Sequence, residues 1–550
     1  MDRRDISKAL LASAAGVALV SQRAQAQTCI TPCYAATLEE TAAAVTPVNP
    51  EYPPGNVLRY GTNAIPGTTP MDTAINNALK CNRKVHAPAG VYRITSSIQV
   101  PRLTELYGDG WGANGLIGGT VFLATTDIEI IASSNLDNES LPCVFLHDFV
   151  AQCTVTGGTT KYQIHLRNPN QTHIVRVKTL SGLLDTNYST TNLAGIWLHK
   201  TLAGEGAYIN RVNACFIQNG GLLIDEGVTD GTIIDNFIYG HCCAHGLKLN
   251  GAGGNWTISG NNLTSPPSAA AIEINSGLNN LIRIVDNFFD GNPAVLDSGL
   301  GIFVNAAQRV QIIGNTLWAM GKSGIRAVDP IGLIVSGNVF LNCNDSNAGF
   351  SDVAIVGHSF QSTMNVVSGN FFQQETSRVN KGCAIEEQND GFNPVQNVYI
   401  GNQISANYLA RPIRTLQGGP QAAKIVGNSG GGSDTELTSS FVATLTGVSG
   451  SVTGIVSYTR NGNLVTLTLP FIQGTSNASG ATLTGLPASV WPANTVIAWG
   501  LTANNSVTAH ARLEVSAAGT ITLYSSPTSA TFATSGSKGI VGATVSYSIT

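Results

Sequence analysis

The amino-acid sequence predicts an all-β protein, built as a long right-handed parallel β-helix that is followed by a small C-terminal β-sandwich. Two short motifs that alternate along the middle of the chain carry this prediction, because each is an alternating apolar stretch typical of a β-strand. The motifs recur every 23 to 32 residues with no helical period between them. One repeat cannot bury its own apolar side chains, so we expect the repeats to stack as the coils of a solenoid.

The first motif places an Asn after Gly or Asp, with an apolar stretch on either side. Asn and Gly tolerate a left-handed backbone, which suits a tight turn between two strands. Stacked Asn side chains can also hydrogen-bond from one coil to the next. We therefore assign these residues to the structure and not to catalysis. The copies lie at Asn236, Asn261, Asn287, Asn315, Asn338, Asn370, Asn402 and Asn428, and a weaker copy lies at Asn213.

The second motif is a short strand that lies between copies of the first. In such a strand every other side chain points outward, and strands of successive coils stack about 4.8 Å apart. Outward residues from distant parts of the sequence are therefore expected to form columns on one wall. The copies begin at Gly195, Gly221, Gly246, Ala271, Gly301 and Gly324, with a looser copy at Gly382.

Changes in composition divide the chain into five parts. Residues 1–26 are predicted as a signal peptide and 27–56 as an N-terminal extension. The β-helix is predicted over 57–428, a Gly/Ser linker over 429–440 and the β-sandwich over 441–550. The last part holds only four charged side chains and several short alternating strands.

The N-terminus is typical of an export signal. Arg3 and Arg4 precede an apolar stretch over 9–20, and 24–26 offer an A-x-A cleavage site. The paired arginines resemble a twin-arginine (Tat) signal, with an ordinary secretory signal as the alternative. We expect an exported protein, periplasmic or extracellular, and no membrane span, because the apolar stretch is too short to cross a bilayer.

Charge and cysteine content argue against several classes of function. Only 11% of the residues are charged, the formal net charge is −4 and no basic tract occurs, so nucleic acid is not an expected partner. The ten cysteines form no paired CxxC motifs, which argues against a zinc site. We expect them to pack in the stacked interior or to form disulfides, and Cys29 and Cys33 are close enough to pair.

Four short pieces mark the start of the predicted β-helix: 59–61 (RYG), a helix over 71–79, 88–92 (PAGVY) and 106–110 (LYGDG). They resemble the opening of the pectate-lyase-like superfamily, which includes phage tailspikes and family 28-type glycosidases. In that superfamily the helix covers the open end of the solenoid, whose edge would otherwise recruit other strands. The usual GDGxxDD run is missing here, and only Asp72 remains, which we expect to cap the helix. The resemblance implies the fold and does not by itself imply an activity.

The C-terminal part is similar to the C-terminal modules of phage tail proteins. That likeness implies trimerisation or receptor binding, so a homotrimer is one expected assembly. The alternative is a folded cap on a protein of undetermined oligomeric state.

One predicted column of outward side chains is rich in aromatic and charged groups for so weakly charged a chain. An aromatic ring can stack on a sugar and charged groups can hold its polar substituents, so we predict a polysaccharide-binding surface. Its substrate-binding candidates are Trp197, Phe303, His199 and His165. The alternative is an ordinary exposed face on which Lys248 and Glu273 simply pair. The column reads His165, Trp197, Leu223, Lys248, Glu273, Phe303 and Arg326; its neighbour reads His199, Asp225, Asn250, Asn275, Asn305 and Val328, and we expect Glu386 to continue the neighbour.

Two reaction schemes fit this surface. Inverting hydrolysis needs two carboxyl groups about 6.5–9.5 Å apart, for which Glu273 and Asp225 are the candidates. Elimination by a lyase needs a base beside a uronate carboxylate and a cation that neutralises it, for which Lys248 and Arg326 are the candidates. No metal and no cofactor are predicted. Calcium is considered only for the lyase scheme, and no compact Asp cluster marks a calcium site.

The sequence thus favours an exported carbohydrate-active protein, a polysaccharide hydrolase or lyase that works on an extended glycan along the β-helix flank. The alternative is a catalytically inactive glycan-binding or tailspike-like adhesin, whose C-terminal module serves assembly or receptor binding. The missing GDGxxDD run favours the adhesin, and the aromatic and charged column favours the enzyme.

Overall fold

The computed structural model describes residues 33–549 except for the short segments 113–117, 135–138, 184–188, 202–206, 252–253, 268, 276–280, 292–298, 344–349, 375–381, 406–407, 409–411, 417–421, 429–436 and 462–463. The predicted signal peptide, Cys29 and most of the predicted linker lie outside the described residues. Among the residues that are described, none of the helices has both the length and the apolar character that a membrane crossing requires.

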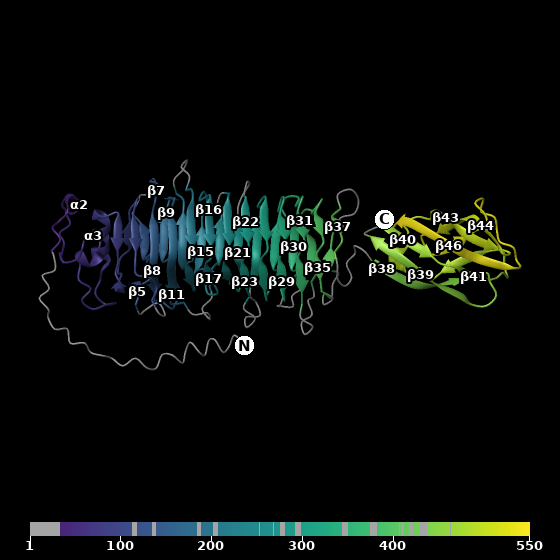
Figure 1. Ribbon diagram of the computed structural model, residues 1–550, viewed down its shortest axis with the longest axis horizontal. Helices are drawn as coiled ribbons and strands as arrows, with labels where there is room; N and C mark the ends of the chain where they lie inside the picture. The colour runs from purple at the N-terminus through teal and green to yellow at the C-terminus, as the bar shows by residue number, and fades with distance from the viewer. Residues whose placement is uncertain are drawn as a thin grey trace, which may run out of the picture.

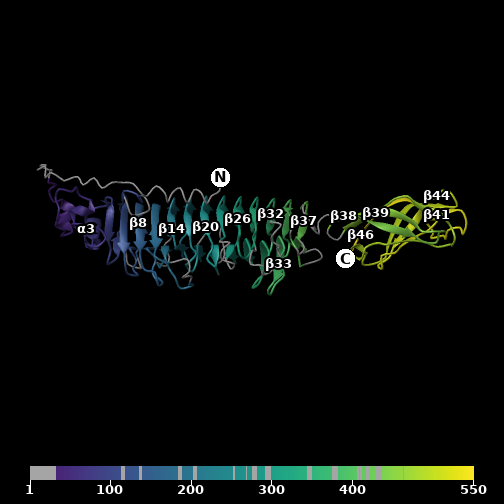
Figure 2. The same cartoon turned by 90° about the horizontal axis from the view of Figure 1, so that it is seen from below.

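Parallel strands stacked along one long axis form a β-helix, as predicted (Figure 1; Figure 2). A 12-stranded sheet, sheet B, forms one wall, and a 23-stranded sheet, sheet A, forms the rest. The pairings join each strand to its counterpart one coil away, as β18 joins β21 in sheet B. Sheet B contains β3 (Ile98–Val100), β6 (Ile131–Ser133), β9 (Ile164–Arg167), β12 (Gly195–His199), β15 (Gly221–Ile224), β18 (Leu247–Asn250), β21 (Ala270–Asn275), β24 (Leu300–Asn305), β27 (Ile325–Val328), β30 (Val353–Gly357), β33 (Ile385–Asn389) and β36 (Ile413–Arg414).

Sheet A consists of two files of strands that share the long strands β8 (Phe145–Cys153) and β11 (His173–Ser181). The first file also contains β1 (Lys84–His86), β4 (Glu105–Tyr107), β13 (Asn210–Asn213), β16 (Gly231–Ile234), β19 (Trp256–Ser259), β22 (Ile282–Val285), β25 (Val310–Ile313), β28 (Ile334–Ser336), β31 (Val366–Ser368), β34 (Val398–Ile400) and β37 (Lys424–Val426). The second contains β2 (Gly90–Arg93), β5 (Thr120–Ala124), β14 (Phe216–Gln218), β17 (Phe237–Tyr239), β20 (Asn262–Thr264), β23 (Phe288–Asp290), β26 (Thr316–Trp318), β29 (Val339–Leu341), β32 (Phe371–Gln373) and β35 (Gln403–Ile404). A small pair, β7 (Leu141–Pro142) and β10 (Pro169–Asn170), stands apart.

A column of buried asparagines lies between the two files of sheet A and fixes the register of successive coils. The backbone N–H and the side-chain Nδ2 of Asn287 both donate to Oδ1 of Asn315, at 2.9 Å each. Nδ2 of Asn315 in turn donates to the carbonyl of Ile284 at 2.9 Å. Both side-chain ends are thus satisfied in the interior. The same ladder runs through Asn236, Asn261, Asn287, Asn315, Asn338, Asn370, Asn402 and Asn428.

The ladder corrects two details of the sequence interpretation. Asn213 is not part of it: Phe216 pairs with Phe237, so Cys215 occupies the ladder position, and its backbone N–H donates to Oδ1 of Asn236 at 2.8 Å. The ladder needs only an N–H from its first member, which any residue but proline can supply. The left-handed conformation belongs to the Gly or Asp before each Asn, not to the Asn itself.

Inward side chains fill the space between the sheets. Rings of successive coils stack there, as Phe340 and Phe372 do with centroids 4.6 Å apart. Cys81, Cys153 and Cys215 are buried in this interior without a disulfide partner, which confirms for them the expected packing role.

The N-terminal end of the β-helix is covered by α3 (Asp72–Cys81), as the resemblance implied, and by a strap over residues 33–45 that carries α2 (Leu38–Ala42). The apolar face of α3 is buried, with Ile75 fully enclosed. The short helix η2 (Val57–Arg59) follows the strap. The edge of the first coil is thereby protected from pairing with other strands.

Asp72 does not cap α3, contrary to expectation. The N-cap is Met71, and no side chain bonds the first turn from that position. Asp72 instead accepts hydrogen bonds from the backbone N–H of Thr95 at 3.1 Å and from Ser96 Oγ at 2.7 Å. It therefore ties the helix to the turn that precedes β3, a tertiary role that local spacing does not reveal.

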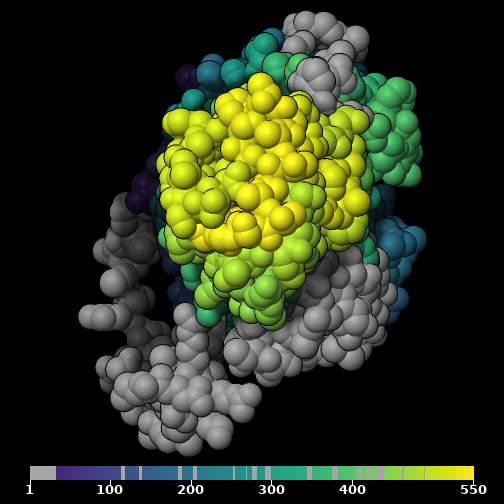
Figure 3. Space-filling view, turned by 90° about the vertical axis from the view of Figure 1, so that its right-hand side faces the viewer, coloured from purple at the N-terminus to yellow at the C-terminus, as the bar shows by residue number. Residues whose placement is uncertain are grey.

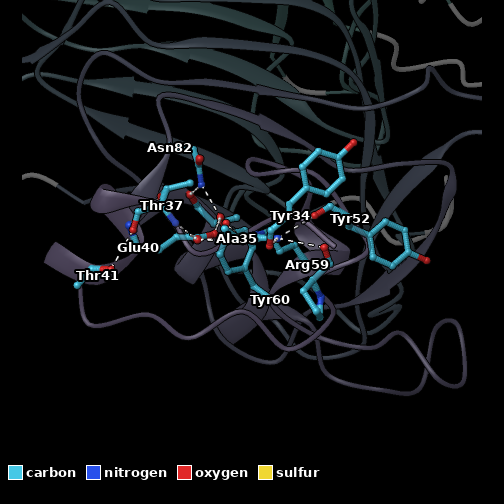
Figure 4. Close-up of polar contacts among 11 residues, drawn as sticks. Tyr34, Ala35, Thr37, Glu40, Thr41, Tyr52, Arg59, Tyr60 and Asn82 are labelled. Atoms are coloured by element: carbon cyan, nitrogen blue, oxygen red, sulfur yellow. Dashed lines mark hydrogen bonds and ion pairs between the residues drawn. The ribbon is translucent and has the colours of Figure 1, made fainter. Parts of the chain in front are cut away.

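A buried ion pair holds the strap against the β-helix (Figure 4). Arg59 Nε lies 2.7 Å from Glu40 Oε1, and both side chains are 0% exposed. Arg59 Nη2 also donates to the backbone carbonyl of Ala35 at 2.9 Å, and Tyr60 Oη donates to Glu40 at 2.8 Å. Asn82 at the end of α3 donates to the same Tyr60 hydroxyl. The charges are thus fully hydrogen-bonded, which a buried pair requires.

The C-terminal domain is an antiparallel unit whose strands close on themselves. Strand β46 pairs back with β40, so the predicted β-sandwich is closed as a barrel. Figure 3 views the molecule from the side of this domain, drawn in yellow and yellow-green. Its first strand begins at Leu437 and not at residue 441. The elements are β38 (Leu437–Leu445), β39 (Val452–Asn461), β40 (Leu464–Leu469), β41 (Ile472–Thr475), β42 (Ala481–Thr484), η4 (Ala488–Val490), β43 (Val496–Asn504), β44 (Val507–Val515), β45 (Ile521–Leu523) and β46 (Ser537–Ser548).

Replacing Asn315 by Ala should destabilise the β-helix, because it leaves the buried backbone N–H of Asn287 without an acceptor and removes the bonds of the Asn315 side chain to Asn287 and Asn338. A buried donor without an acceptor costs about 1–3 kcal/mol and the lost side-chain bonds add to this, so we expect the free energy of unfolding to fall by roughly 3 kcal/mol. Urea unfolding followed by circular dichroism measures the change. The control is Asn275→Ala, which interrupts a partly exposed ladder on sheet B and should cost less than about 1 kcal/mol. Equal losses would contradict the role of the buried ladder.

The strap should also make stability depend on acidity. Hydrogen bonding to Arg59 lowers the pKa of Glu40 from 4.5 to about 2. A lowered carboxyl pKa stabilises the folded state above pH 4.5, and this contribution, about 3 kcal/mol, is lost as the pH falls from 4.5 towards 2. Unfolding measured between pH 7 and pH 2.5 should show that loss in the wild type and a smaller one in Glu40→Gln. Glu39→Gln, on the exposed face of α2, is the control and should behave as the wild type.

Candidate functional site

The outer face of sheet B carries the residues that the sequence singled out (Figure 1 labels β9, β15, β21 and β30 along this sheet). The register places them in one column: His165, Trp197, Leu223, Lys248, Glu273, Phe303 and Arg326. Each step of the column is one coil, about 4.8 Å. The predicted column is thus confirmed.

The neighbouring column is confirmed in part. Asn250, Asn275, Asn305 and Val328 follow one another in register. Asp225 lies just past the end of β15 and reaches the column through a hydrogen bond from Asn250 Nδ2 at 3.0 Å.

Glu386 was assigned to the wrong column. It pairs with Ala354, which pairs with Arg326, so it continues the first column; Gln388 continues the second. The loose motif copy at Gly382 is out of register by two residues, because Ile385 and not Cys383 follows Ile325 and Val353 in the stack.

Three rings stack on this face and form, with two carboxylates, the cluster that we call the histidine–tryptophan cluster. The centroid of the Trp197 ring lies 4.0 Å from that of His165 and 4.4 Å from that of His199, and it is within 10° of parallel to each imidazole. The two imidazole centroids lie 5.6 Å apart. Nε2 of His165 lies 3.4 Å from Nδ1 of His199. Such offset stacking of rings on adjacent strands fixes their orientation. The cluster consists of Glu129, His165, Trp197, His199 and Asp225.

A carboxylate stands at each end of the cluster. Glu129 Oε1 lies 2.8 Å from Nδ1 of His165, and this hydrogen bond is the main reason why the pKa of Glu129 is lowered. At the other end, Asp225 Oδ2 accepts from Trp197 Nε1 at 3.3 Å and lies 4.0 Å from His199 Nε2. The two imidazoles are therefore held between acids, an arrangement that fixes the orientation of both rings.

The cluster rests on a buried pair of polar side chains. Tyr162 packs against Trp197 with ring centroids 5.4 Å apart, and its hydroxyl lies 3.3 Å from Nε2 of His245. Burial lowers the pKa of His245 to about 4, so this histidine is neutral near pH 7. Sequence reasoning missed Glu129 and Tyr162, because both lie outside the repeat motif, in turns or before a strand.

The central part of the column is an ion pair. Lys248 Nζ lies 2.9 Å from Glu273 Oε1, with 24% and 17% of the side chains exposed, which matches the alternative that the sequence left open. Asp225 is two coils from Glu273, roughly 10 Å along the axis, and it belongs to the other column besides. The structure does not bring these two carboxyl groups together as a close pair.

The far end of the face is a separate polar group. Phe303 lies between Glu273 and Arg326 in register. Arg326 donates through Nη1 to Gln388 at 2.9 Å, and burial lowers its pKa. Gln388 donates to Glu386, which also contacts Arg414. Arg326 is thus three coils from Lys248 and does not join it.

Among the described residues, no group of three or more His, Cys, Asp or Glu side chains is arranged to hold a metal ion.

The Lys248–Glu273 pair gives a measurable prediction. Because both groups remain partly exposed, their coupling energy in a double-mutant cycle should be about 0.5–1 kcal/mol. Urea unfolding of Lys248→Met, Glu273→Gln and the double variant measures this value. A coupling near zero would show that the two charges stand near each other without stabilising the fold. The pair Lys84–Glu105 on sheet A, 3.0 Å apart but more exposed, is the comparison and should couple more weakly.

Comparison with known proteins identifies the fold. Residues 220–404 match the protein family described as "Right handed beta helix region". The A-module of a mannuronan C-5 epimerase from Azotobacter vinelandii is similar with a TM-score of 0.50 at 16% identity, over 68% of this chain and 98% of that one. Tailspike protein 2 of Escherichia coli O157:H7 bacteriophage CAB120 gives 0.44 at 12% identity, over 90% and 65%. The catalytic unit of an α-1,3-glucanase from Streptomyces thermodiastaticus gives 0.44 at 16% identity, over 69% and 70%.

No protein of curated function matches the sequence. The family match and the coil-by-coil parallel register agree on the architecture, and they leave the activity to be argued from the residues of the face. The chain folds as a right-handed parallel β-helix.

Proposed function

We propose that this protein acts on an acidic polysaccharide, which lies along the outer face of sheet B and is cleaved by elimination at the histidine–tryptophan cluster. The observation that carries the proposal is that two histidines stack on Trp197 on one face of the β-helix, with the Lys248–Glu273 ion pair beginning two coils further along the same face. Coils about 4.8 Å apart give a row of evenly spaced groups, which suits a linear polymer of repeating units.

His199 is the candidate base. It is 27% exposed, whereas His165 is 3% exposed and bound to Glu129. In the proposed reaction His199 takes the proton beside the uronate carboxylate, the electron pair forms a carbon–carbon double bond, and the bond to the glycosidic oxygen breaks. The protonated imidazole can return its proton to the leaving oxygen. Asp225, 4.0 Å from Nε2, would stabilise the imidazolium that forms in between.

We assign Lys248 and Arg326 the role of cations and not of bases. Lys248 already forms an ion pair with Glu273, and the guanidinium of Arg326 keeps its proton at any ordinary pH. Lys248 lies one coil beyond Leu223 and two beyond Trp197, within reach of the next sugar unit. We therefore assign it to the substrate carboxylate, with Trp197 and Phe303 as stacking platforms. Neutralising that carboxylate makes the adjacent proton easier to remove.

Two-carboxylate hydrolysis has weaker support. Glu273 and Asp225 are offset along both the axis and the strand, by roughly 10 Å in the first direction alone. Inverting enzymes place their carboxyl groups about 6.5–9.5 Å apart. The Glu273 carboxylate is also engaged by Lys248.

A second function, glycan binding without cleavage, is favoured by a specific observation. The charged groups of the column are already satisfied within the protein, Lys248 by Glu273 and Arg326 by Gln388. A tailspike-like adhesin of this kind would use its C-terminal barrel for assembly as a trimer or for receptor binding. Export through the N-terminal arginine-containing signal belongs to both proposals and places the protein where polysaccharides occur.

The test is incubation with a panel of acidic and neutral polysaccharides. We expect unsaturated uronates, detected by their ultraviolet absorbance, from an acidic polymer. His199→Asn should lower that rate by about a hundredfold or more, the usual contribution of a general base. His358→Asn, at an exposed loop position, is the matched control and should keep the wild-type rate.

Other outcomes decide between the alternatives. New reducing ends without unsaturated uronates would indicate hydrolysis instead of elimination. Loss of that hydrolytic activity in Glu273→Gln would then identify Glu273 as a catalytic group. Binding without any product would support the adhesin. A protein that neither binds nor cleaves any member of the panel would contradict both functions.

A further inference from the structure

Three cavities at the N-terminal end of the β-helix join into one groove, which we call the cap groove. The largest, about 520 Å³, lies between the strap and the end of α3. It shares Leu79, Lys80 and Pro101 with a cavity of about 380 Å³ that opens towards sheet B. It shares Arg83 and Thr104 with a cavity of about 350 Å³ that opens towards sheet A. Each has the size of an ordinary ligand site.

The walls of the groove are basic. Lys80, Arg83 and Arg102 line it with exposed side chains, and none of them forms an ion pair with an acid in the described part of the chain. Lys84 adds a fourth cation, balanced by Glu105 at 3.0 Å. The chain has only 29 lysines and arginines in 550 residues, and four of them line this one groove.

One acid, Glu39, stands on the strap side, and the groove as a whole therefore attracts anions. The strap itself forms a wall through Glu39, Ala42 and Ala43. Its position depends on the buried Glu40–Arg59 pair (Figure 4). The groove is thus a built feature of the cap and not a gap between loosely placed loops.

The groove lies at the N-terminal end of the column that carries the proposed catalytic face, and the two column residues between the groove and Trp197 are buried. Gln99 lines the 380 Å³ cavity and is also the first outward residue of the sheet B column. From Gln99 the column leads through Ala132 and His165 to Trp197, three coils or roughly 14 Å away. A linear polymer that lies on the cluster would therefore reach Lys80 and Arg102 after a few sugar units.

We propose that the cap groove is an anion-binding subsite, which takes the charged groups of a glycan whose chain continues onto the outer face of sheet B. This inference rests on the proposed function, because it assumes that a glycan lies on that face. It narrows the substrate class to polymers with a negative charge on several successive units. Arginine forks bind carboxylate and sulfate alike, so both chemistries fit.

The test compares binding of oligosaccharides of increasing length. The probes are oligogalacturonides, sulfated oligosaccharides and neutral oligoglucans, each titrated calorimetrically into the full-length protein. In the wild type we expect affinity for a charged probe to rise with its length, once it can reach from Trp197 to the groove. The combined variant Lys80→Gln, Arg83→Gln and Arg102→Gln should lose about tenfold or more for long charged probes and nothing for short ones.

A matched control removes three cations elsewhere. Arg211, Arg283 and Lys424 are exposed on the outer face of sheet A, and changing each to Gln alters the net charge equally. This control should bind every probe as the wild type does. Thermal unfolding of both triple variants checks that they remain folded.

The two proposals fail in different ways. If the groove variant binds long charged probes as tightly as the wild type, or if neutral probes gain as much affinity with length, the groove inference is overturned while elimination at His199 can stand. If binding depends on the groove and no polymer is cleaved, the groove stands and the enzymatic proposal falls. If sulfated probes bind more tightly than carboxylated ones, the cap groove remains an anion-binding subsite and its ligand is a sulfated glycan.

Discussion

The buried asparagine ladder is the constraint on which the outer faces of this β-helix depend. Each Asn donates twice to the next one, and the interior offers those donors no water as a substitute. A slip of one residue would leave several donors unpaired and would turn apolar side chains outward. The register of the coils from Cys215 to Asn428 is therefore fixed, and with it the vertical order of their outward side chains. The register thus decides which side chains lie next to each other on the outer face, and a functional site on this fold depends on that arrangement.

Two candidate sites lie mainly on the coils that precede this ladder, where the parallel pairing of the strands sets the register. On sheet B it stacks His165, Trp197 and His199 and holds them between Glu129 and Asp225. At the N-terminal end, the strap and α3 add cations around a groove that meets the first residue of the same column. A solenoid binds along its length, so a recognition element at its end and chemistry three coils away can serve one polymer.

The N-terminal cap contains both buried and exposed charged side chains, although the chain as a whole has few of them. Arg59 and Glu40 are fully enclosed, and their remaining donors and acceptors are satisfied by backbone carbonyls and by Tyr60. Breaking one partner would leave the other charge buried, which is costly, so the pair specifies where the strap lies more than it adds to stability. The cations of the cap groove, in contrast, are exposed and remain available for a ligand.

The sequence by itself determined the β-helix, the ladder and the central column, because period and alternation are local patterns that report which side of a strand is buried. Lys248, Glu273 and Arg326 could be placed in one file for that reason. Only the tertiary structure decided that Lys248 and Glu273 pair, that Glu386 lies in the first column, and that Glu129 completes the cluster. These facts depend on turns whose lengths differ from coil to coil. The sequence of a turn has no hydrophobic periodicity, so the positions of its residues could not be predicted from the sequence. The same reason explains why Asn213 resembled a ladder member, although the coil geometry gives that position to Cys215.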